Sequence, residues 1–185
     1  LTGSGFIDGA SCEMALTLSS MMQKIGGLQG TLLYNVDDYG KTLASAHGVG
    51  LTKAEFDKQI VKKPQAVSYV YNTNEWFVSA LGLTLVKTAE VREPLFSERE
   101  LRSKAVDKMI PAGDCTGMKV VATTTTKEGV TIVSQQIGKC YEDGDEDFVS
   151  WSFEGEPAGV QFQMRSPPTV QMTSTATISR ITQII

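Results

Sequence analysis

Polar and acidic side chains follow a run of β-forming residues near the amino terminus. Residues 28–37 are rich in strand formers, and the polar turn Asp37-Asp38-Tyr39-Gly40 ends the predicted strand. Segments that connect a strand to a helix often line pockets, so Asn35, Asp37 and Tyr39 are predicted substrate contacts. The alternative is an acidic turn whose carboxylates accept hydrogen bonds from the local backbone. The sequence leaves both interpretations open.

The chain contains one histidine, His47, in a loop bounded by glycines. Its imidazole would titrate near neutral pH without any shift of its pKa, which suits a substrate contact. The alternative is a surface or helix-capping histidine. A single histidine excludes metal sites built from several imidazoles, and no acidic partner nearby in the sequence defines a catalytic dyad.

Aromatic residues are concentrated between residues 69 and 76. Tyr69 and Tyr71, together with Trp76, could form the wall of an apolar substrate pocket. Aromatic residues at helical spacing also form ordinary core contacts, which is the alternative for all three.

Two glycines near the start, in Gly3-Ser4-Gly5, suggest a phosphate-binding loop. The dinucleotide fingerprint GxGxxG needs a third glycine at position 8, where Asp8 stands, and a strand before the first glycine. The segment is therefore not predicted to bind phosphate. An interdomain turn is the simplest interpretation.

An acidic run occupies residues 142–147. Its carboxylates are spaced like those of some calcium loops, but the twelve-residue EF-hand pattern is missing. We expect a solvated hairpin tip.

Composition excludes several kinds of partner. The formal net charge is -4, with scattered Lys and Arg, which argues against nucleic acid. No apolar stretch approaches the roughly 20 residues of a membrane span. Cys12, Cys115 and Cys140 form no CxxC pair, so free thiols and a cytoplasmic location are expected. The 185 residues are predicted to form one domain, 1–185, and the start at Leu1 suggests that the protein continues upstream.

The spacing of apolar residues predicts helices. One begins at a capping box in which Thr52 is the N-cap and Glu55 lies three residues later. The last, residues 169–185, is rich in weakly helix-forming Thr and Ser. The predicted helices are 9–24, 52–61, 68–81 and 169–185. The predicted buried side of the third consists of Trp76, Phe77, Ala80 and Leu81.

Alternation of apolar and polar residues predicts strands through most of the second half. It is clearest where Val149, Trp151 and Phe153 point the same way. A turn at residues 127–129 joins two strands and indicates an antiparallel meander. The predicted strands are 28–37, 83–94, 100–108, 116–127, 130–141, 147–154 and 159–165.

These elements predict an α+β fold, with a mixed, largely antiparallel sheet and helices on one face. The few helices can cover only one face of so long a sheet. Val121, Val130, Ile132 and the Thr-rich residues 122–126 are predicted to leave a half-apolar face open, as a subunit interface.

Several short segments, taken in order, resemble a family of oxidoreductases. They include residues 3–9, 36–40 and 80–83, the HGVGLTKAEF run from His47, and the acidic strand 90–94. Further markers are Ile110-Pro111-Ala112-Gly113, with Gly117 beyond it, and a Thr/Ala-rich end at Ile181. The chain resembles the C-terminal domain of 2,4-diaminopentanoate dehydrogenase and its amine dehydrogenase relatives, and more distantly that of dihydrodipicolinate reductase.

The resemblance implies a two-domain oxidoreductase. An N-terminal Rossmann domain, missing from this chain, would bind NAD or NADP, and this domain would bind an amine, imine or amino-acid-like substrate. It implies that Gly3, Ser4, Gly5 and Phe6 pass close to the nicotinamide and substrate, and that the sheet forms a homodimer. The isolated chain would then be inactive.

Some positions depart from the family pattern. Ile7-Asp8-Gly9 stands where relatives carry an Asn-Pro-Gly turn, and Ser179 falls where they carry Asn. The histidine- and lysine-bearing stretch of dihydrodipicolinate reductase is absent after residue 37. These departures motivate one alternative, a standalone small-molecule-binding or cyclase-like domain without redox activity. The Thr-rich sheet face and the lack of a strong catalytic constellation motivate another, a purely structural oligomerisation domain.

Overall fold

The computed structural model describes residues 11–63 and 66–166. Its elements, in chain order, are α1 (Ser11–Ser19), β1 (Lys24–Asn35), η2 (Val36–Tyr39), α2 (Lys41–Ala46), α3 (Lys53–Phe56), η3 (Asp57–Val61), α4 (Tyr69–Ala80), β2 (Leu85–Phe96), β3 (Leu101–Ser103), β4 (Lys108–Ile110), β5 (Cys115–Thr126), β6 (Thr131–Lys139), β7 (Asp147–Glu156) and β8 (Gln161–Ser166).

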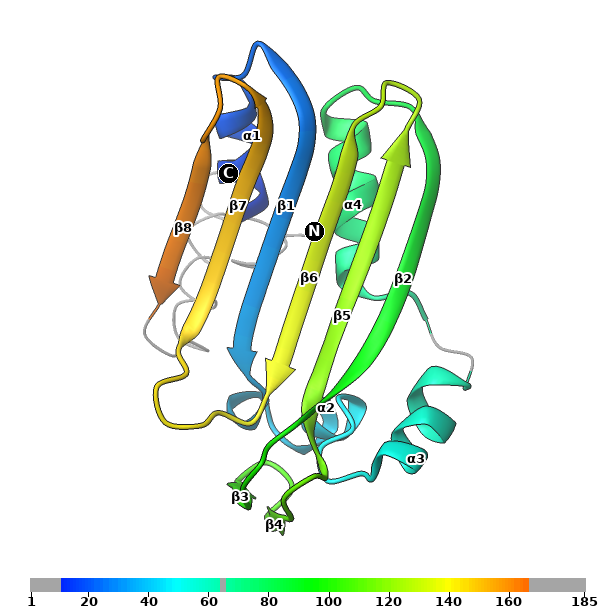
Figure 1. Ribbon diagram of the computed structural model, residues 1–185, viewed down its shortest axis with the longest axis vertical. Coiled ribbons are helices and arrows are strands. Elements are labelled where there is room, and N and C mark those ends of the chain that lie inside the picture. The colour runs from blue at the N-terminus through cyan, green and yellow to red at the C-terminus, as the bar shows by residue number, and fades with distance from the viewer. Residues whose placement is uncertain (1–10, 64–65, 167–185) are drawn as a thin grey trace, which may run out of the picture.

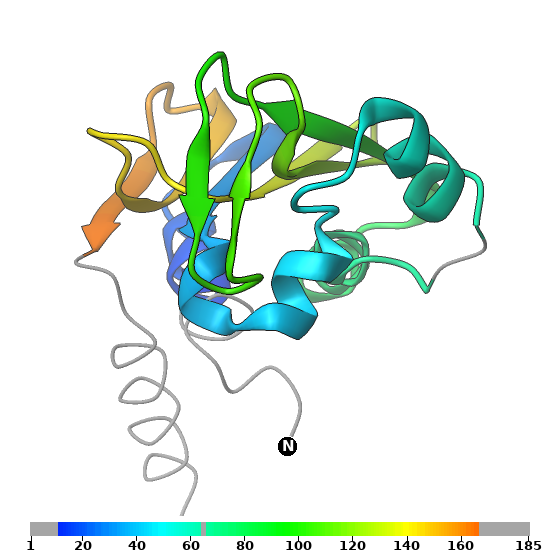
Figure 2. The ribbon, with the colours of Figure 1, turned by 90° about the horizontal axis from the view of Figure 1, so that it is seen from below.

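Six of the strands form one sheet in the order β2-β5-β6-β1-β7-β8 (Figure 1). β1 runs parallel to β6, and every other neighbouring pair in this sheet is antiparallel. β3 and β4 form a separate two-stranded hairpin. Helix α4 packs on β2, β5 and β6, and α1 packs on β7 and β8. Figure 2 shows both helices on the same side of the sheet. The predicted α+β fold is confirmed.

The helix-covered face of the sheet carries the core. Leu28 and Leu32 of β1 and Ile132 of β6 are buried there. Val149, Trp151 and Phe153 of β7 are all buried, which confirms that they point the same way. Since side chains alternate along a strand, the residues between them belong to the opposite face.

No helix among the described residues packs on the opposite face, called the open face below. It carries half-buried Leu33, Val121, Val133 and Ile137 among polar side chains, with Val91 exposed at the edge strand. Val121 was expected there. The expectation was wrong for Ile132 of β6 and for Val130 just before this strand, which are buried in the core on the helix-covered side. It was also wrong for Ala122 and Thr124 of β5, which pair with the inward-facing Ser134 and Ile132 and are buried.

Helix α4 confirms the prediction for 68–81, but its buried side differs. The Ser68 hydroxyl caps its first turn by accepting from the Tyr71 N–H. The buried positions follow the three- and four-residue spacing of a helix and are Val70, Thr73, Asn74, Phe77 and Val78. Trp76 is 40% exposed, and Ala80 is also exposed, so the predicted buried side was partly wrong.

Buried Asn74 shows why the helix turns this face inward. Its amide donates to the carbonyls of Ala122 (3.0 Å) and Ile132 (3.1 Å), and its oxygen accepts from the Ser134 hydroxyl (2.5 Å). Burial of a side-chain amide costs little free energy when the amide has hydrogen-bond partners, and it destabilises the fold when the amide has none. Three bonds to β5 and β6 therefore fix α4 on the sheet.

The first helix is shorter than predicted. It ends at Ser19, where the Ser19 and Ser20 hydroxyls donate to carbonyls of the last turn. Gly26 and Gly27 lie inside β1, where the register shifts between Ile25 and Gly27. Glycine in a strand often marks such an irregularity.

The segment after β1 and the segment 100–108 also differ from expectation. The strand ends at Asn35, and two short helical segments, η2 and α2, follow. Residues 100–108 were expected to be one strand but form most of the β3–β4 hairpin, whose turn contains Asp107 at φ 52°.

The capping box at Thr52 is confirmed by hydrogen bonds in both directions between Thr52 and Glu55 (2.9 and 3.3 Å). The predicted helix 169–185 lies outside the described residues.

Candidate functional site

The carboxyl ends of β1 and β6 meet at one edge of the sheet, because these two neighbours are parallel. β1 leads into η2 and α2, and β6 leads into Cys140 and Tyr141. β7 starts at the same edge with Asp147, and the β3–β4 hairpin lies close to it (Figure 1). Side chains from four separate segments therefore gather here, and we call this place the strand-end site.

Asn35 and Asp37 both lie at the strand-end site, but their polar atoms have internal partners. The Asn35 side-chain oxygen accepts from the Asp37 N–H (3.1 Å) and caps η2. The Asp37 carboxylate accepts from the Ser103 hydroxyl (2.5 Å) and from two backbone N–H groups of the hairpin, those of Ala105 (3.1 Å) and Lys104 (3.2 Å). Asp37 thus anchors the hairpin to η2.

Two carboxylates, Asp38 and Asp147, and two tyrosines, Tyr39 and Tyr141, lie near one another at the same edge. The Tyr141 hydroxyl donates to Asp147 (2.6 Å), and Asp38 is exposed. Burial raises the pKa of Asp38, the neighbouring Asp147 raises it further, and Lys104 opposes both. Tyr39 is half-buried beside them. The arrangement suits a cation, since like charges held close together gain from a positive partner.

A buried chain of hydrogen bonds lies beneath Tyr39. The Tyr39 ring meets the Tyr34 ring edge-on, with centroids 5.4 Å apart. The Tyr34 hydroxyl bonds His47 Nε2 (2.6 Å) and accepts from Gln136, while His47 Nδ1 lies 2.9 Å from the Leu43 carbonyl. A carbonyl only accepts, so Nδ1 carries the proton and Nε2 accepts from Tyr34.

His47 is 4% exposed, so it supports Tyr34 from inside the fold. Burial lowers the pKa of His47, an effect that the Leu43 carbonyl partly offsets. Burial also raises the pKa of Tyr34 well above its usual range. Gly138 makes the space for this pair, because a Cβ there would lie 2.6 Å from the His47 ring and 2.8 Å from that of Tyr34. The capping alternative for His47 also holds, since it closes α2.

Tyr69 and Tyr71 lie elsewhere, on the first turn of α4. Tyr69 is half-buried between the two parts of the core. Tyr71 lines a groove of about 510 Å³ between β2, the end of η3 and the start of α4. The structure therefore brings Asn35, Asp37, Tyr39 and His47 together and separates Tyr69 and Tyr71 from them.

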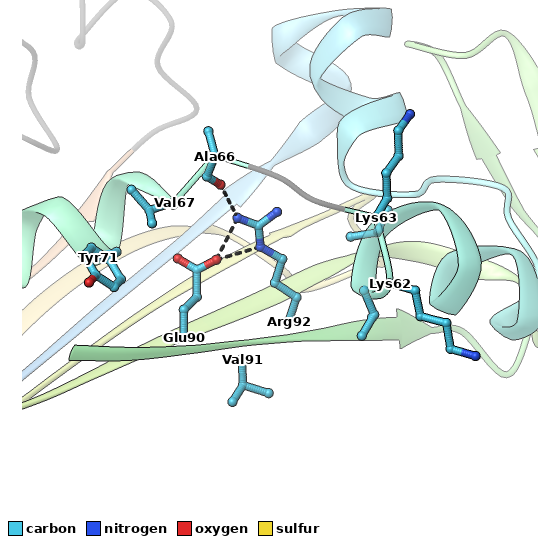
Figure 3. Close-up of a pocket in the computed structure, with 10 residues that line it drawn as sticks. Lys62, Lys63, Ala66, Val67, Tyr71, Glu90, Val91 and Arg92 are labelled. Atoms are coloured by element: carbon cyan, nitrogen blue, oxygen red, sulfur yellow. Dashed lines mark hydrogen bonds and ion pairs between the residues drawn. The ribbon is translucent and has the colours of Figure 1, made fainter. Parts of the chain in front are cut away.

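The floor of that groove is an ion pair. Figure 3 shows Glu90 and Arg92 rising from β2 toward the loop that carries Ala66. Arg92 bonds Glu90 (2.7 Å) and the Ala66 carbonyl (2.7 Å), and Glu90 accepts from the Ser68 N–H (2.8 Å). Burial raises the pKa of Glu90, but the bonds from Ser68 and Arg92 outweigh it and leave the pKa below its ordinary value. The pair fastens the start of α4 to the edge strand.

The acidic run 142–147 has partners of its own. Glu142 pairs with Arg99 (3.3 Å), Asp145 with Lys139 (2.9 Å), and Glu146 with Arg165. Within the described residues no group of His, Cys, Asp and Glu is arranged to hold a metal ion. The run therefore tethers the β6–β7 connection around Asp147.

Buried thiols flank the strand-end site. Cys115 and Cys140 are free and buried. Burial raises the pKa of the Cys140 thiol to about 12, and the nearby Asp37 carboxylate adds to the effect. Burial also raises the pKa of Cys115. A thiol acts as a nucleophile through its thiolate, so neither cysteine is suited to covalent catalysis.

Tyr34, Gln136, Tyr141 and Asp147 were not predicted from the sequence. Tyr34 and Gln136 meet through the parallel pairing of β1 with β6, which joins distant parts of the chain. Asp147 ends the acidic run, so its sequence context suggested a solvated residue. Gly3, Ser4, Gly5 and Phe6 lie outside the described residues.

The sequence was compared with known families. Residues 12–184 match the family described as "2,4-diaminopentanoate dehydrogenase C-terminal domain". The chain belongs to this family. A comparison with curated proteins finds no match.

Among solved structures, this family member is similar to the "Structure of Amine Dehydrogenase from Mycobacterium smegmatis", with a TM-score of 0.85 and 27% identity over 97% of the chain. The chain corresponds to 53% of that protein, so it spans about half the length of this relative. A likeness to an oxidoreductase domain protein from Kribbella flavida, with a TM-score of 0.40, 9% identity and coverage of 84% of this chain and 38% of that one, carries no argument.

The family name implies a dehydrogenase cofactor, which the described residues do not fit. β1 and β6 are the only parallel neighbours in the sheet that they form, and the segments that follow these strands carry single glycines, Gly40 and Gly144. A dinucleotide fold needs the glycine-rich turn GxGxxG between a parallel strand and a helix, and neither segment has it. No helix in this part of the chain is long and apolar enough to cross a membrane.

Proposed function

We propose that this chain is the substrate-binding part of an NAD(P)-dependent amine dehydrogenase-like enzyme, and that the strand-end site binds the amine or imine form of the substrate. The nicotinamide nucleotide, NAD or NADP, would be bound mainly by a Rossmann domain in another part of the protein. The family match and the likeness to an amine dehydrogenase support this proposal.

One observation carries the assignment of the substrate group. Asp38 and Asp147 lie together with Tyr39 and Tyr141 at one edge of the sheet. Carboxylates attract an ammonium or iminium group, and tyrosine rings stabilise a cation through their faces. Amine chemistry places a positive charge on the substrate nitrogen, so this constellation suits that nitrogen.

Tyr141 holds one of these carboxylates in place. Burial raises the pKa of its hydroxyl well above the usual range, and the bond to the Asp147 carboxylate adds to that effect. The hydroxyl therefore stays protonated at neutral pH and donates to Asp147, which leaves the other carboxylate oxygen for a ligand. On the other side, the buried chain from Gln136 to His47 fixes Tyr34 below Tyr39.

The proposal includes a homodimer formed through the open face. Leu33, Val121, Val133 and Ile137 supply its apolar area. A cytoplasmic location is proposed from the three cysteines, which are free thiols, because disulfides are rare in that compartment.

The test is an activity assay of the full-length protein that contains this chain. NADH and NADPH are each mixed with ammonium and a panel of short-chain ketones, aldehydes and keto acids, and nucleotide oxidation is followed by absorbance. We expect oxidation that needs both ammonium and the carbonyl compound. Oxidation that is independent of ammonium, or none with any substrate of the panel, would contradict the proposal.

A further inference from the structure

Three residues from neighbouring strands form a row on the helix-covered face. Gly30 of β1 pairs with Ser134 of β6 on one side and with Trp151 of β7 on the other. The Trp151 ring leans over Gly30, since a Cβ on Gly30 would lie 2.2 Å from Trp151 Cζ3. The Trp151 ring therefore occupies the space in which a side chain at position 30 would lie.

The indole of Trp151 is buried together with its Nε1–H donor. The residue is 5% exposed, and its ring packs at a tilt on Phe77 of α4, with centroids 4.8 Å apart. Among the residues that the structure describes, its Nε1–H group has no hydrogen-bond partner. A buried donor without a partner is destabilising, and such donors are rare in native proteins.

A small cavity lies beside this ring. It has a volume of about 10 Å³ and is lined by Trp151, Gly30 and Ser134 from the sheet, with Tyr69 and Thr73 of α4 among the residues above them. A space of about this size holds one water molecule when polar groups surround it. No charged side chain lines the cavity, and it is too small for an organic ligand.

We propose that one buried water molecule occupies this cavity, where its oxygen accepts a hydrogen bond from Trp151 Nε1 and its hydrogens go to the hydroxyls of the lining. Ser134 is suited to accept one of them. Its own hydroxyl proton goes to Asn74, so its lone pairs remain for the water. Thr73 supplies a second hydroxyl on the α4 side.

This water would extend an existing polar network. Asn74 joins α4 to β5 and β6 through the carbonyls of Ala122 and Ile132 and through Ser134. A water between Ser134 and Trp151 would carry the same network to β7. It would then connect α4 with three strands of the sheet by hydrogen bonds inside an otherwise apolar layer.

The test is a high-resolution crystal structure of the full-length protein, together with NMR detection of magnetisation transfer from long-lived water to the Trp151 Nε1–H. We expect one ordered water within hydrogen-bonding distance of Nε1 and an Overhauser cross-peak with the sign of a long-lived water, whereas Trp76, which is 40% exposed, should show only exchange with bulk water. An empty cavity, or an Nε1–H bonded directly to a protein or ligand oxygen, would overturn the proposal.

Two variants sharpen the test. Trp151→Phe keeps most of the ring and deletes the donor, and it should lose the water. Trp76→Phe is the matched control and should keep both the water and the Trp151 cross-peak. If Trp151→Phe does not fold, the crystal structure and NMR spectrum of the unaltered protein decide the matter alone; a variant that folds and retains a fully ordered water would contradict the role of Nε1.

Discussion

At the residue scale, the strand-end site combines the exposed Asp38 and the half-buried Asp147 with a buried layer that supports Tyr39. His47 shows how different these two environments are. It is the only histidine of the chain, yet it is buried and neutral, with both ring nitrogens bonded inside the fold. Its contribution is to hold Tyr34, and through that ring Tyr39, in position.

The buried state of His47 makes stability depend on pH. The pKa of His47 is lowered by burial in the folded state and has its ordinary value of 6.5 in the unfolded chain. As pH falls through 6.5, the histidine of the unfolded chain binds a proton before that of the folded protein does. Protonation therefore stabilises the unfolded state, and the free energy of unfolding should decrease from pH 7 toward about pH 5. Urea denaturation at several pH values should show this decrease in the unaltered protein and a smaller one in His47→Gln. Equal decreases in both proteins would count against the buried neutral histidine.

The carboxylate of Glu90 affects the stability of the protein in a lower pH range than His47 does. The pKa of Glu90 is lowered from 4.5, so its stabilising contribution is present above that value and is lost as pH falls through its folded-state pKa. Measurements that stay above pH 5 therefore avoid the titration of Glu90, and the comparison with His47→Gln assigns the remaining pH dependence.

Asp37 is the residue whose sequence context was most ambiguous. The prediction of a substrate contact is untested, and the three bonds of Asp37 come from the distant hairpin, one of them from a hydroxyl, and not from the local backbone of the alternative. A turn motif alone could not decide between them, because Ser103 and Ala105 lie more than 60 residues further along the chain.

We expect Asp37→Ala to destabilise the protein by about 2 kcal/mol, because hydrogen bonds to a charged group contribute roughly 1.5–3 kcal/mol. Asp143→Ala is the control, since the Asp143 side chain is fully exposed and its contact with Arg99 is long at 3.9 Å. Denaturant unfolding measures both. Similar stabilities of the two variants would show that the hairpin is held by something other than Asp37.

At the element scale, the sequence predicted the long strands and α4 well but not the order of the strands. Alternation fixes which residues of β7 face inward, and the capping box marks the start of α3. The parallel neighbour of β1 is β6, about 100 residues later, and no local pattern encodes that pairing. The strand-end site depends on it, so Tyr34, Gln136 and Asp147 were missed.

The packing of β7 against β1 restricts position 30 to glycine. A Cβ at this position would collide with the Trp151 ring, so Gly30→Ala should destabilise the protein by about 1–3 kcal/mol, the usual cost of overpacking a core. Gly26→Ala is the matched control in the same strand, because its nearest contact would be 3.5 Å away. Thermal unfolding compares the two. A neutral Gly30→Ala would mean that the indole has room to move.

At the scale of the whole molecule, the sheet has one covered face and one open face. The sequence predicted this division from the small number of helices. Val130 and Ile132 were assigned to the wrong face. Alternation divides the side chains of a strand into two sets, but the sequence alone does not say which set faces the helices. The family is that of a dehydrogenase C-terminal domain, and the chain spans about half the length of the amine dehydrogenase that it resembles.

We expect the full-length protein to be a dimer through the open face. Val133→Glu places a charge at the middle of that face and should shift light scattering from dimer toward monomer. Met14→Glu, on the exposed side of α1, is the control and should leave the mass unchanged. A dimer that persists in Val133→Glu would place the interface elsewhere.

The most direct test of the central claim is the KM for ammonium of the full-length protein with a ketone substrate. Asp38→Asn removes one charge from the strand-end site and should raise this KM by about tenfold, equivalent to about 1.4 kcal/mol. Asp143→Asn removes the same charge from the neighbouring acidic loop, where its side chain is fully exposed, and should leave the KM nearly unchanged. If the two variants behave alike, the strand-end site does not bind the substrate nitrogen.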